Sequence, residues 1–219
     1  GSWPLQYRMW LERRAPVATR SARRRWRGRP RERPAPHSDD IAMTASTIAS
    51  PTRDLLGECP LWDTREACVY WVDSKAPLVR RLDPATGART DWRVPSDIGS
   101  IALTETGRLL LALEDGFHLL DLASGATRQI AHVTHAGPRM RMNDGRTDRQ
   151  GRFVAGSLVM GRHDKDGAFY RLEKDGTVTT LLRDIALANS TCFSPDGRTM
   201  HYSDSFSDTV HAVDYDPAS

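Results

Sequence analysis

The segment "SPDGRTMHYSDSF" (residues 194–206) joins a tight turn to a short apolar strand, and this combination decides the fold. The same pattern occurs three more times, as "WDTREACVYWVDS" (62–74), "LTETGRLLLALED" (103–115) and "TDRQGRFVAGSLV" (147–159). Aligned on the turn, the equivalent positions follow one another in steps of 41, 44 and 46 residues: Glu66, Gly107, Gly151 and Gly197. Self-similarity at a fixed period of this length is typical of repeat architectures.

A second type of turn recurs between the copies of the first. Each copy joins a short apolar strand, an acidic residue and a Gly or Pro turn: "RLDPATGA" (81–88), "LLDLASGA" (119–126), "YRLEKDGT" (170–177) and "AVDYDPAS" (212–219). Two hairpin turns per repeat indicate four short strands per repeat, and no stretch between them has a helical period. We therefore predict an all-β fold, a β-propeller with one blade per repeat.

The composition predicts a globular protein with one sizeable core. Of the 219 residues, 39% are hydrophobic and 27% are charged. Apolar runs such as "RLLLAL" are far shorter than the roughly 20 residues of a membrane-spanning helix, so no membrane partner is expected. The three cysteines, Cys59, Cys68 and Cys192, are odd in number and lack CxxC spacing. This argues against a disulfide framework and a zinc knuckle, and indicates a cytoplasmic location.

The first 40 residues differ in character from the rest of the chain. They contain eleven arginines and four acids, a balance of +7, which leaves −4 for the remainder. Because this segment is rich in Arg and Pro without an apolar period, we predict that residues 1–42 form a disordered, non-native extension. Residues 43–219 are then the partial propeller, with Met43 as the natural start. The alternative is a basic arm that binds nucleic acid, but no nucleic-acid partner is expected.

The repeat register also predicts a site, because a propeller brings equivalent positions of its blades together around one axis. Eight residues before the aligned turns lie Glu58, Gly99, Asn143 and Asn189, and seven residues after them lie Asp73, Glu114, Leu158 and Asp204. Taken singly, these residues are ordinary turn or loop residues, and "NDGR" at Asn143 is a common turn sequence. Taken together, their oxygen atoms form a shell suited to a hard divalent cation.

Three segments then carry a resemblance to a known family: "GECPLWD" (57–63), "RMNDGRTDRQGRFVAGS" (141–157) and "NSTCFSPDGRTMHYSDS" (189–205). They are similar, in the same order, to signature segments of the SMP-30/gluconolactonase/regucalcin family. The resemblance implies a six-bladed propeller with one divalent cation on its axis. Six blades of this size need roughly 260 residues, whereas the chain from Leu55 onward suffices for about four. We therefore expect a truncated propeller.

The resemblance also implies roles for individual residues. The metal ligands would be four oxygen donors: Glu58, Asn143, Asn189 and Asp204. Arg141 and Asn143 would contact the substrate, and Asp204 is the candidate general base. The cation would be Ca, Zn, Mn, Mg or Fe(II). The chain departs from the family pattern at Cys59 and Ser190, which stand where family members have glycine.

The expected activity is the metal-dependent hydrolysis of a sugar lactone to the aldonic acid. The expected partner is accordingly a small-molecule sugar lactone. The alternatives are a propeller that binds its cation without catalysis, an interaction module, or an inactive fragment. No G-x-S-x-G, Walker or G-x-G-x-x-G motif is found, so serine-hydrolase, P-loop and dinucleotide chemistry have no support in the residues.

Overall fold

The structure, a computed structural model, describes residues 47–218, and every regular element within them is a β-strand. Residues 52–218 form one compact unit, whereas residues 47–51 belong to a second unit and contain no strand. The predicted disordered extension, residues 1–42, lies outside the described residues. Within this described part, no helix has the length and apolar character that a membrane crossing needs.

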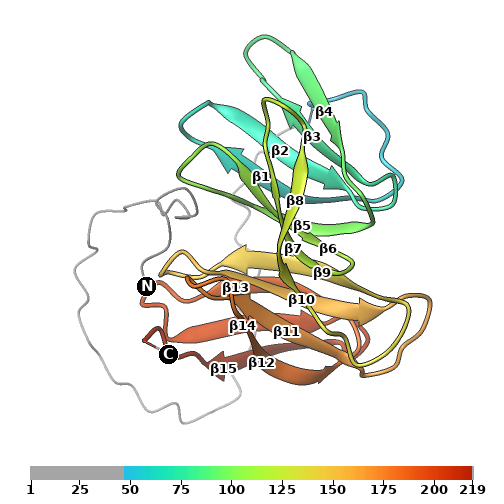
Figure 1. Cartoon of the computed structure of the whole chain (residues 1–219), viewed down its shortest axis with the longest axis vertical. Coiled ribbons are helices and arrows are strands. Elements are labelled where there is room, and N and C mark those ends of the chain that lie inside the picture. Colours follow the sequence, from blue (N-terminus) through green and yellow to red (C-terminus); the bar gives the residue numbers. More distant parts are fainter. Residues whose placement is uncertain (1–46, 219) are drawn as a thin grey trace, which may run out of the picture. The chain divides into compact units, whose positions relative to one another are not determined.

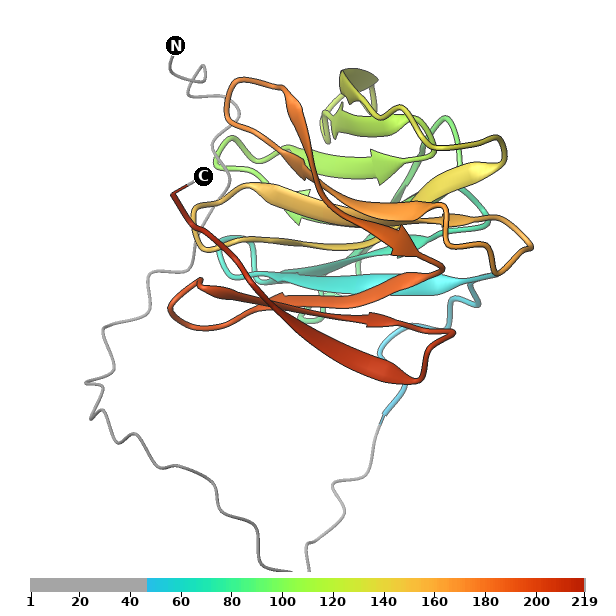
Figure 2. The same ribbon diagram turned by 90° about the horizontal axis from the view of Figure 1, so that it is seen from below.

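Fifteen strands form four antiparallel sheets, one for each sequence repeat (Figures 1 and 2). The first blade contains β1 (Gly57–Asp63), β2 (Cys68–Asp73), β3 (Leu78–Leu82) and β4 (Arg89–Arg93). The second contains β5 (Ile98–Leu103), β6 (Leu109–Leu113), β7 (Gly116–Leu120) and β8 (Thr127–His132). The third contains β9 (Met140–Thr147), β10 (Phe153–Val159), β11 (Gly167–Leu172) and β12 (Val178–Ile185), and the fourth contains β13 (Ala188–Phe193), β14 (Thr199–Asp204) and β15 (Thr209–Asp214).

The strand order confirms the predicted all-β propeller, of which four blades are present. Within each blade the strands are hydrogen-bonded in chain order. The first strand of each blade lies beside the first strand of the next, so β1, β5, β9 and β13 line the inner side. The equivalent positions of the repeat are therefore neighbours in space, as the site prediction requires.

Both types of predicted turn are present and depend on a left-handed residue. The β3–β4, β7–β8 and β11–β12 turns each place a glycine at positive φ: Gly87 (75°), Gly125 (73°) and Gly176 (87°). Each of these glycines donates its N–H to the carbonyl of the acidic residue at the start of the turn, over 2.8–3.0 Å. Glycine adopts this conformation without the steric cost that a Cβ would add.

The core consists of layers between neighbouring blades, and β6 illustrates why its sequence is continuously apolar. All five residues of β6 are buried, and successive side chains point to opposite faces of the sheet. Leu109 and Leu111 pack in the layer shared with the first blade, whereas Leu110 packs in the layer shared with the third. The outer strands β4 and β15 are mostly exposed.

A buried ionic cluster connects the third and fourth blades near the β9–β10 turn. The Asp148 carboxylate is fully buried and accepts hydrogen bonds from Arg152 Nε (2.7 Å) and the Tyr215 hydroxyl (2.7 Å). Its other oxygen accepts the backbone N–H groups of Gln150 and Arg152. Tyr215 follows β15, so this cluster ties the end of the fourth blade to the third.

Candidate functional site

A β-bulge marks the first strand of every blade at the predicted axial position. The register against the second strand gains one extra residue directly at or after four positions: Glu58, Gly99, Asn143 and Asn189. A bulge bends its strand and redirects the side chains beside it, which is why bulges are frequent next to functional sites. The four positions that the repeat alignment grouped together are thus equivalent in the structure.

The bulges explain the two departures from the glycine pattern. Cys59 and Ser190 directly follow Glu58 and Asn189, and both adopt positive φ, at 51° and 58°. Glycine adopts this conformation readily, so the positive φ accounts both for the glycine that the family resemblance implies at these positions and for the backbone strain of Cys59 and Ser190. Burial raises the pKa of the Cys59 thiol to about 11, which leaves it protonated and unreactive near neutral pH.

Asn143 is the central residue of the site and is 2% exposed. Its amide nitrogen donates to Asn189 Oδ1 (3.0 Å) and to the carbonyl of Ala188 (2.8 Å), both on β13. Its amide oxygen accepts a hydrogen bond from Arg141 Nη1 (2.8 Å), two residues earlier on β9. Asn143 therefore brings Arg141 and Asn189 together, as the sequence predicts for a shared site.

Arg141 is a buried arginine that has no carboxylate partner within residues 47–218. Its Nη1 also donates to the carbonyl of Met142 (2.9 Å), but its buried Nε has no hydrogen-bond partner among the described residues. Burial lowers the pKa of Arg141, against the opposing effect of the carboxylates of Glu58, Asp97 and Glu114. None of these lies within ion-pair distance, so the guanidinium retains hydrogen-bonding capacity for a ligand.

Glu58 is a half-buried carboxylate that accepts no hydrogen bond from the part of the chain that the structure describes. Burial raises the pKa of Glu58, while the nearby charges of Arg141 and Asp144 act in opposite directions on it. These interactions place Glu58 in the same neighbourhood as the Asn143 cluster. A half-buried carboxylate without a donor among residues 47–218 is open to bind a cation.

Gly99, the axial residue of the second blade, has no side chain because the third blade occupies its space. A Cβ built on Gly99 would lie 2.4–2.6 Å from backbone atoms of Asn143. The next residue, Ser100, donates its hydroxyl to the carbonyl of Asn143 (2.9 Å). The second blade thus positions Asn143 and supplies no ligand of its own at this position.

Asp204 is in a different environment from the other predicted ligands. Its two carboxylate oxygens accept the backbone N–H groups of Ala186 and Leu187, both over 3.0 Å, in the loop before β13. Asp73 makes the same arrangement in the first blade, where it accepts the N–H groups of Leu55 (3.0 Å) and Leu56 (3.1 Å).

This arrangement, which we call the carboxylate clasp, attaches the segment before the first strand of a blade to the end of its second strand. Asp73 and Asp204 occupy the same repeat position and are both buried. The clasp gives Asp204 a structural role, which argues against its predicted roles as metal ligand and general base.

The remaining predicted ligands have side-chain groups of the type that binds a hard divalent cation. Glu58 offers a carboxylate, and Asn143 and Asn189 offer amide oxygens, which are the ligand types that such cations prefer. Within residues 47–218, no group of three or more His, Cys, Asp or Glu side chains is arranged to hold a metal ion. A site in this part of the chain would therefore depend on the two amides.

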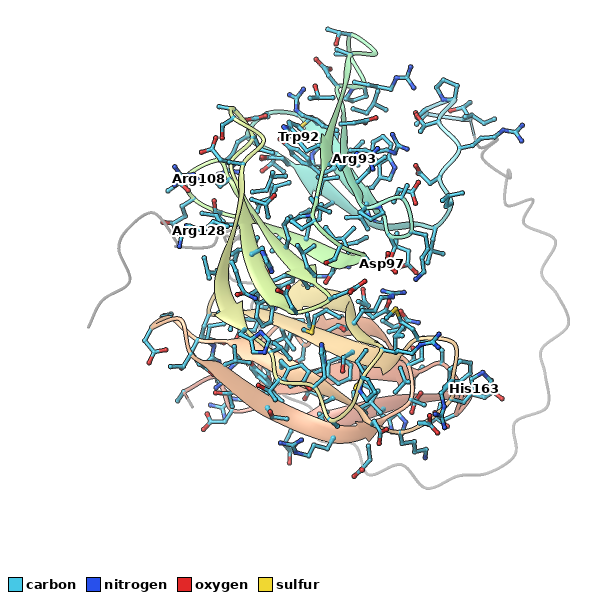
Figure 3. The ribbon with its side chains drawn as sticks, turned by 45° about the vertical axis from the view of Figure 1, so that its right-hand side comes forward. Trp92, Arg93, Asp97, Arg108, Arg128 and His163 are labelled. Carbon is cyan, nitrogen blue, oxygen red and sulfur yellow. The ribbon has the colours of Figure 1, made fainter. Side chains whose placement is uncertain are left out.

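Sequence reasoning missed several polar residues around the site. Asp144 accepts the N–H of Thr191 (2.6 Å) and so joins β9 to β13, although "NDG" was interpreted only through its asparagine. Asp97 forms an ion pair with Lys75, and Figure 3 shows it where the second blade begins. Both lie in loops or bulges, for which a strand pattern gives no signal.

The four blades and the bulged axial positions define a β-propeller, and comparison with known proteins gives the family. Residues 56–219 match the family described as "SMP-30/Gluconolactonase/LRE-like region". The chain belongs to this family.

Several relatives are lactonases by name. The chain is 37% identical over 176 residues to L-arabinolactonase of Azospirillum brasilense, a match that covers 78% of this chain and 58% of that protein. It is 35% identical over 150 residues to 6-deoxy-6-sulfogluconolactonase of Pseudomonas putida, covering 68% and 52%. The chain thus spans between half and three fifths of the length of these relatives.

Two solved structures are also similar to this chain. The crystal structure of a calcium-binding protein, regucalcin, from Agrobacterium tumefaciens has a TM-score of 0.74 and 31% identity, and the match covers 78% of this chain and 58% of that one. A luciferin-regenerating enzyme has a TM-score of 0.72 and 26% identity, with coverage of 78% and 59%.

Proposed function

We propose that this protein takes part in the divalent-cation-dependent hydrolysis of a sugar lactone to its aldonic acid. The main support for the proposal is the cluster in which Asn143 donates a hydrogen bond to Asn189 and accepts one from Arg141, whose Nε has no partner among the described residues. Membership of a family whose relatives include three named lactonases supports the same reaction.

The cation would be held by Glu58, Asn143 and Asn189. When bound, a divalent cation supplies Lewis-acid polarisation of the lactone carbonyl. Its identity, among Ca, Zn, Mn, Mg and Fe(II), is open to the metal titration below. The regucalcin structure that resembles this chain is named as a calcium-binding protein, which supports a cation at this site.

Arg141 and Asn143 would bind and orient the lactone. In the reaction, water adds to the carbonyl carbon, the ring C–O bond breaks, and the ring oxygen takes up a proton to become a hydroxyl. Negative charge develops on the carbonyl oxygen before the ring opens. The buried guanidinium of Arg141 is preorganised to donate hydrogen bonds to that oxygen, or to the lactone hydroxyls.

The test is lactone hydrolysis with each of the five cations and after their removal with a chelator. We expect turnover to depend on one cation, and Arg141→Lys to lower kcat/KM by about 100-fold, because a preorganised donor is lost. The matched control is Arg139→Lys, two residues earlier, whose side chain is exposed. Equal turnover in the Arg141 variant and its control would reject the assignment of Arg141.

The second candidate function is a propeller that binds a cation without catalysis. The name of the regucalcin structure as a calcium-binding protein favours it. Titration calorimetry with the same cations distinguishes the two functions. Cation binding without turnover of any sugar lactone would favour the non-catalytic protein, whereas cation-dependent turnover would favour the lactonase.

A further inference from the structure

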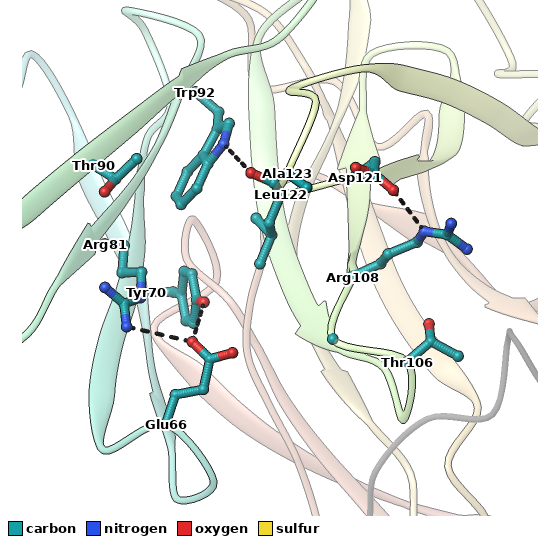
Figure 4. A pocket seen from close by; sticks show the side chains of 11 residues that line it. Glu66, Tyr70, Arg81, Thr90, Trp92, Thr106, Arg108, Asp121, Leu122 and Ala123 are labelled. Carbon is teal, nitrogen blue, oxygen red and sulfur yellow. Dashed lines mark hydrogen bonds and ion pairs between the residues drawn. The ribbon is translucent and has the colours of Figure 1, made fainter.

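A second concave site, independent of the proposed lactone site, lies between the first and second blades. It is a cavity of about 580 Å³, within the range of roughly 300–1,000 Å³ typical of small-molecule sites. The first blade contributes Glu66, Tyr70, Arg81, Thr90 and Trp92, and the second blade contributes residues 106–108 and 121–123 (Figure 4).

This cavity lies at the other end of the blades from the axial cluster. Glu66 is in the turn after β1, whereas Glu58 is near the start of β1. In the second blade, Arg108 and Asp97 precede β6 and β5, and Figure 3 shows them well apart at its two ends. A ligand in the cavity would therefore not touch the axial residues.

The ring of Trp92 forms the aromatic surface of the cavity, and Tyr70, which is only 1% exposed, packs behind it. The rings of Tyr70 and Trp92 lie 6.4 Å apart and are tilted by 33°. The Trp92 indole nitrogen donates to the carbonyl of Leu122 (3.0 Å) in the β7–β8 turn, which holds the ring between the two blades. Figure 4 shows this ring directed toward Tyr70 and Leu122. The aromatic surface is thus rigid before any ligand arrives.

Two pairs of opposite charges form the polar part. Arg81 and Glu66 are paired at 3.4 Å in the first blade, and Arg108 and Asp121 are paired at 3.0 Å in the second. The Arg81–Glu66 contact is long, and only one Glu66 oxygen takes part in it and in the contact with the Tyr70 hydroxyl. The cavity therefore offers both donors and acceptors, with no net charge.

We propose that this cavity binds a neutral saccharide. The positive edge of a sugar's C–H groups packs on the negative face of an aromatic ring, and sugar hydroxyls both donate and accept hydrogen bonds. Arg81 and Glu66 supply the complementary hydrogen-bond partners beside the Trp92 ring. A sugar acid fits less well, because its carboxylate would approach Glu66 and Asp121.

The experiment is NMR titration of the full chain, labelled with ¹⁵N, with D-glucose, D-xylose, D-galactose and, as the charged comparison, D-gluconate. We expect a neutral sugar to shift the amide signals of Gly107 and Ala123, which line the cavity, and not that of Gly145 at the axial site. Glu66→Ala should weaken binding about tenfold, because a charged acceptor is lost.

The matched control is Glu105→Ala, an exposed glutamate of the β5–β6 turn that does not line the cavity. Trp92→Leu, checked for folding by its amide spectrum, is the second variant and should abolish the shifts at Gly107 and Ala123. The proposal is overturned if no neutral sugar shifts these signals, if gluconate binds more tightly, or if the Glu66 and Glu105 variants bind alike.

Discussion

Glu58 and Asp204 are both acids that the sequence assigns to one cation site, yet the structure gives them opposite surroundings. Asp204 is 5% exposed, and both of its oxygens accept backbone N–H groups. Glu58 is half-buried and accepts no hydrogen bond from the described residues. A satisfied buried carboxylate stabilises the fold, whereas one without a donor is available for a ligand. The two acids look alike in the sequence, but the structure shows one with both oxygens occupied by backbone donors and one open to a ligand.

Asp148 is a third acid in this comparison, and it accepts four hydrogen bonds while fully buried. Its replacement should cause the largest loss of stability. Asp148→Ala would remove the closer carboxylate of the buried Arg152 guanidinium, at 2.7 Å, and leave the more distant one of Glu173, at 3.8 Å. We expect unfolding free energy to fall by about 3–5 kcal/mol, as for other broken buried ion pairs. Urea unfolding measures it. Arg162→Ala, which removes an exposed partner of Asp164, is the control and should change stability by less than about 1 kcal/mol.

The two clasps should respond alike if Asp204 is structural. Asp204→Asn and Asp73→Asn each replace one acceptor oxygen by a donor, so that one buried N–H faces another. We expect each variant to lose about 2–3 kcal/mol of unfolding free energy. Thermal unfolding of both variants measures this loss. If Asp204→Asn keeps its stability but loses lactone turnover, then Asp204 is the general base that the sequence predicts, and the comparison with Glu58 fails.

Glu58 should show the opposite pattern to Asp204. Glu58→Gln keeps the shape of the side chain but removes its charge, so we expect unfolding free energy to change by no more than about 0.5 kcal/mol. Cation affinity should fall at least about tenfold, because a charged ligand is lost. Titration calorimetry measures the affinity, and Glu105→Gln serves as the exposed control. Unchanged affinity in Glu58→Gln would mean that Glu58 is not a ligand.

The acid-induced loss of stability gives the smallest expected effect. Burial acts to raise the pKa of Asp73, but three backbone N–H donors and the charge of Arg80 outweigh it, so the pKa lies below its ordinary value of 3.8. The clasp therefore contributes stability above about pH 3.8, and this contribution is lost as pH falls through the lower, folded-state pKa. The Asp73→Asn variant should lose stability less steeply over that range. If the unfolding free energy of the unmodified protein and of Asp73→Asn depended on pH in the same way, ionisation of Asp73 would not be the cause of the acid-induced loss.

The fold follows from the sequence because its signals are local and repeated. Each turn glycine, such as Gly107 or Gly176, marks a left-handed position that few other residues tolerate, and the apolar runs between turns have the length of strands. The turn-and-strand pattern is weak evidence in one repeat, but its recurrence in four repeats makes the fold prediction strong. The β1–β2 turn of the first blade is the exception, since it has no glycine and its positive φ falls on Ala67 rather than on the aligned Glu66.

The candidate site follows from the sequence only in part. The register grouped Glu58, Asn143 and Asn189 correctly as equivalent positions, because the bulge recurs in each first strand. The same register could not distinguish Asp204 as a clasp residue, since the N–H groups that it accepts belong to a loop with no pattern of its own. Whether a carboxylate accepts backbone N–H groups depends on the path of the neighbouring loop. An alignment of repeat positions does not contain that information.

The recurring bulge also has a consequence for how such a protein can change over evolutionary time. A bulged residue is exempt from the in-and-out alternation of its strand, so its side chain can be exchanged without repacking either core layer. Each blade thereby contributes one interchangeable position to the axis, which holds Glu in the first blade and Asn in the third and fourth. In the second blade this position cannot accept a side chain, because the backbone of Asn143 fills the space beside Gly99. New chemistry at the axis is therefore expected to arise in the other blades.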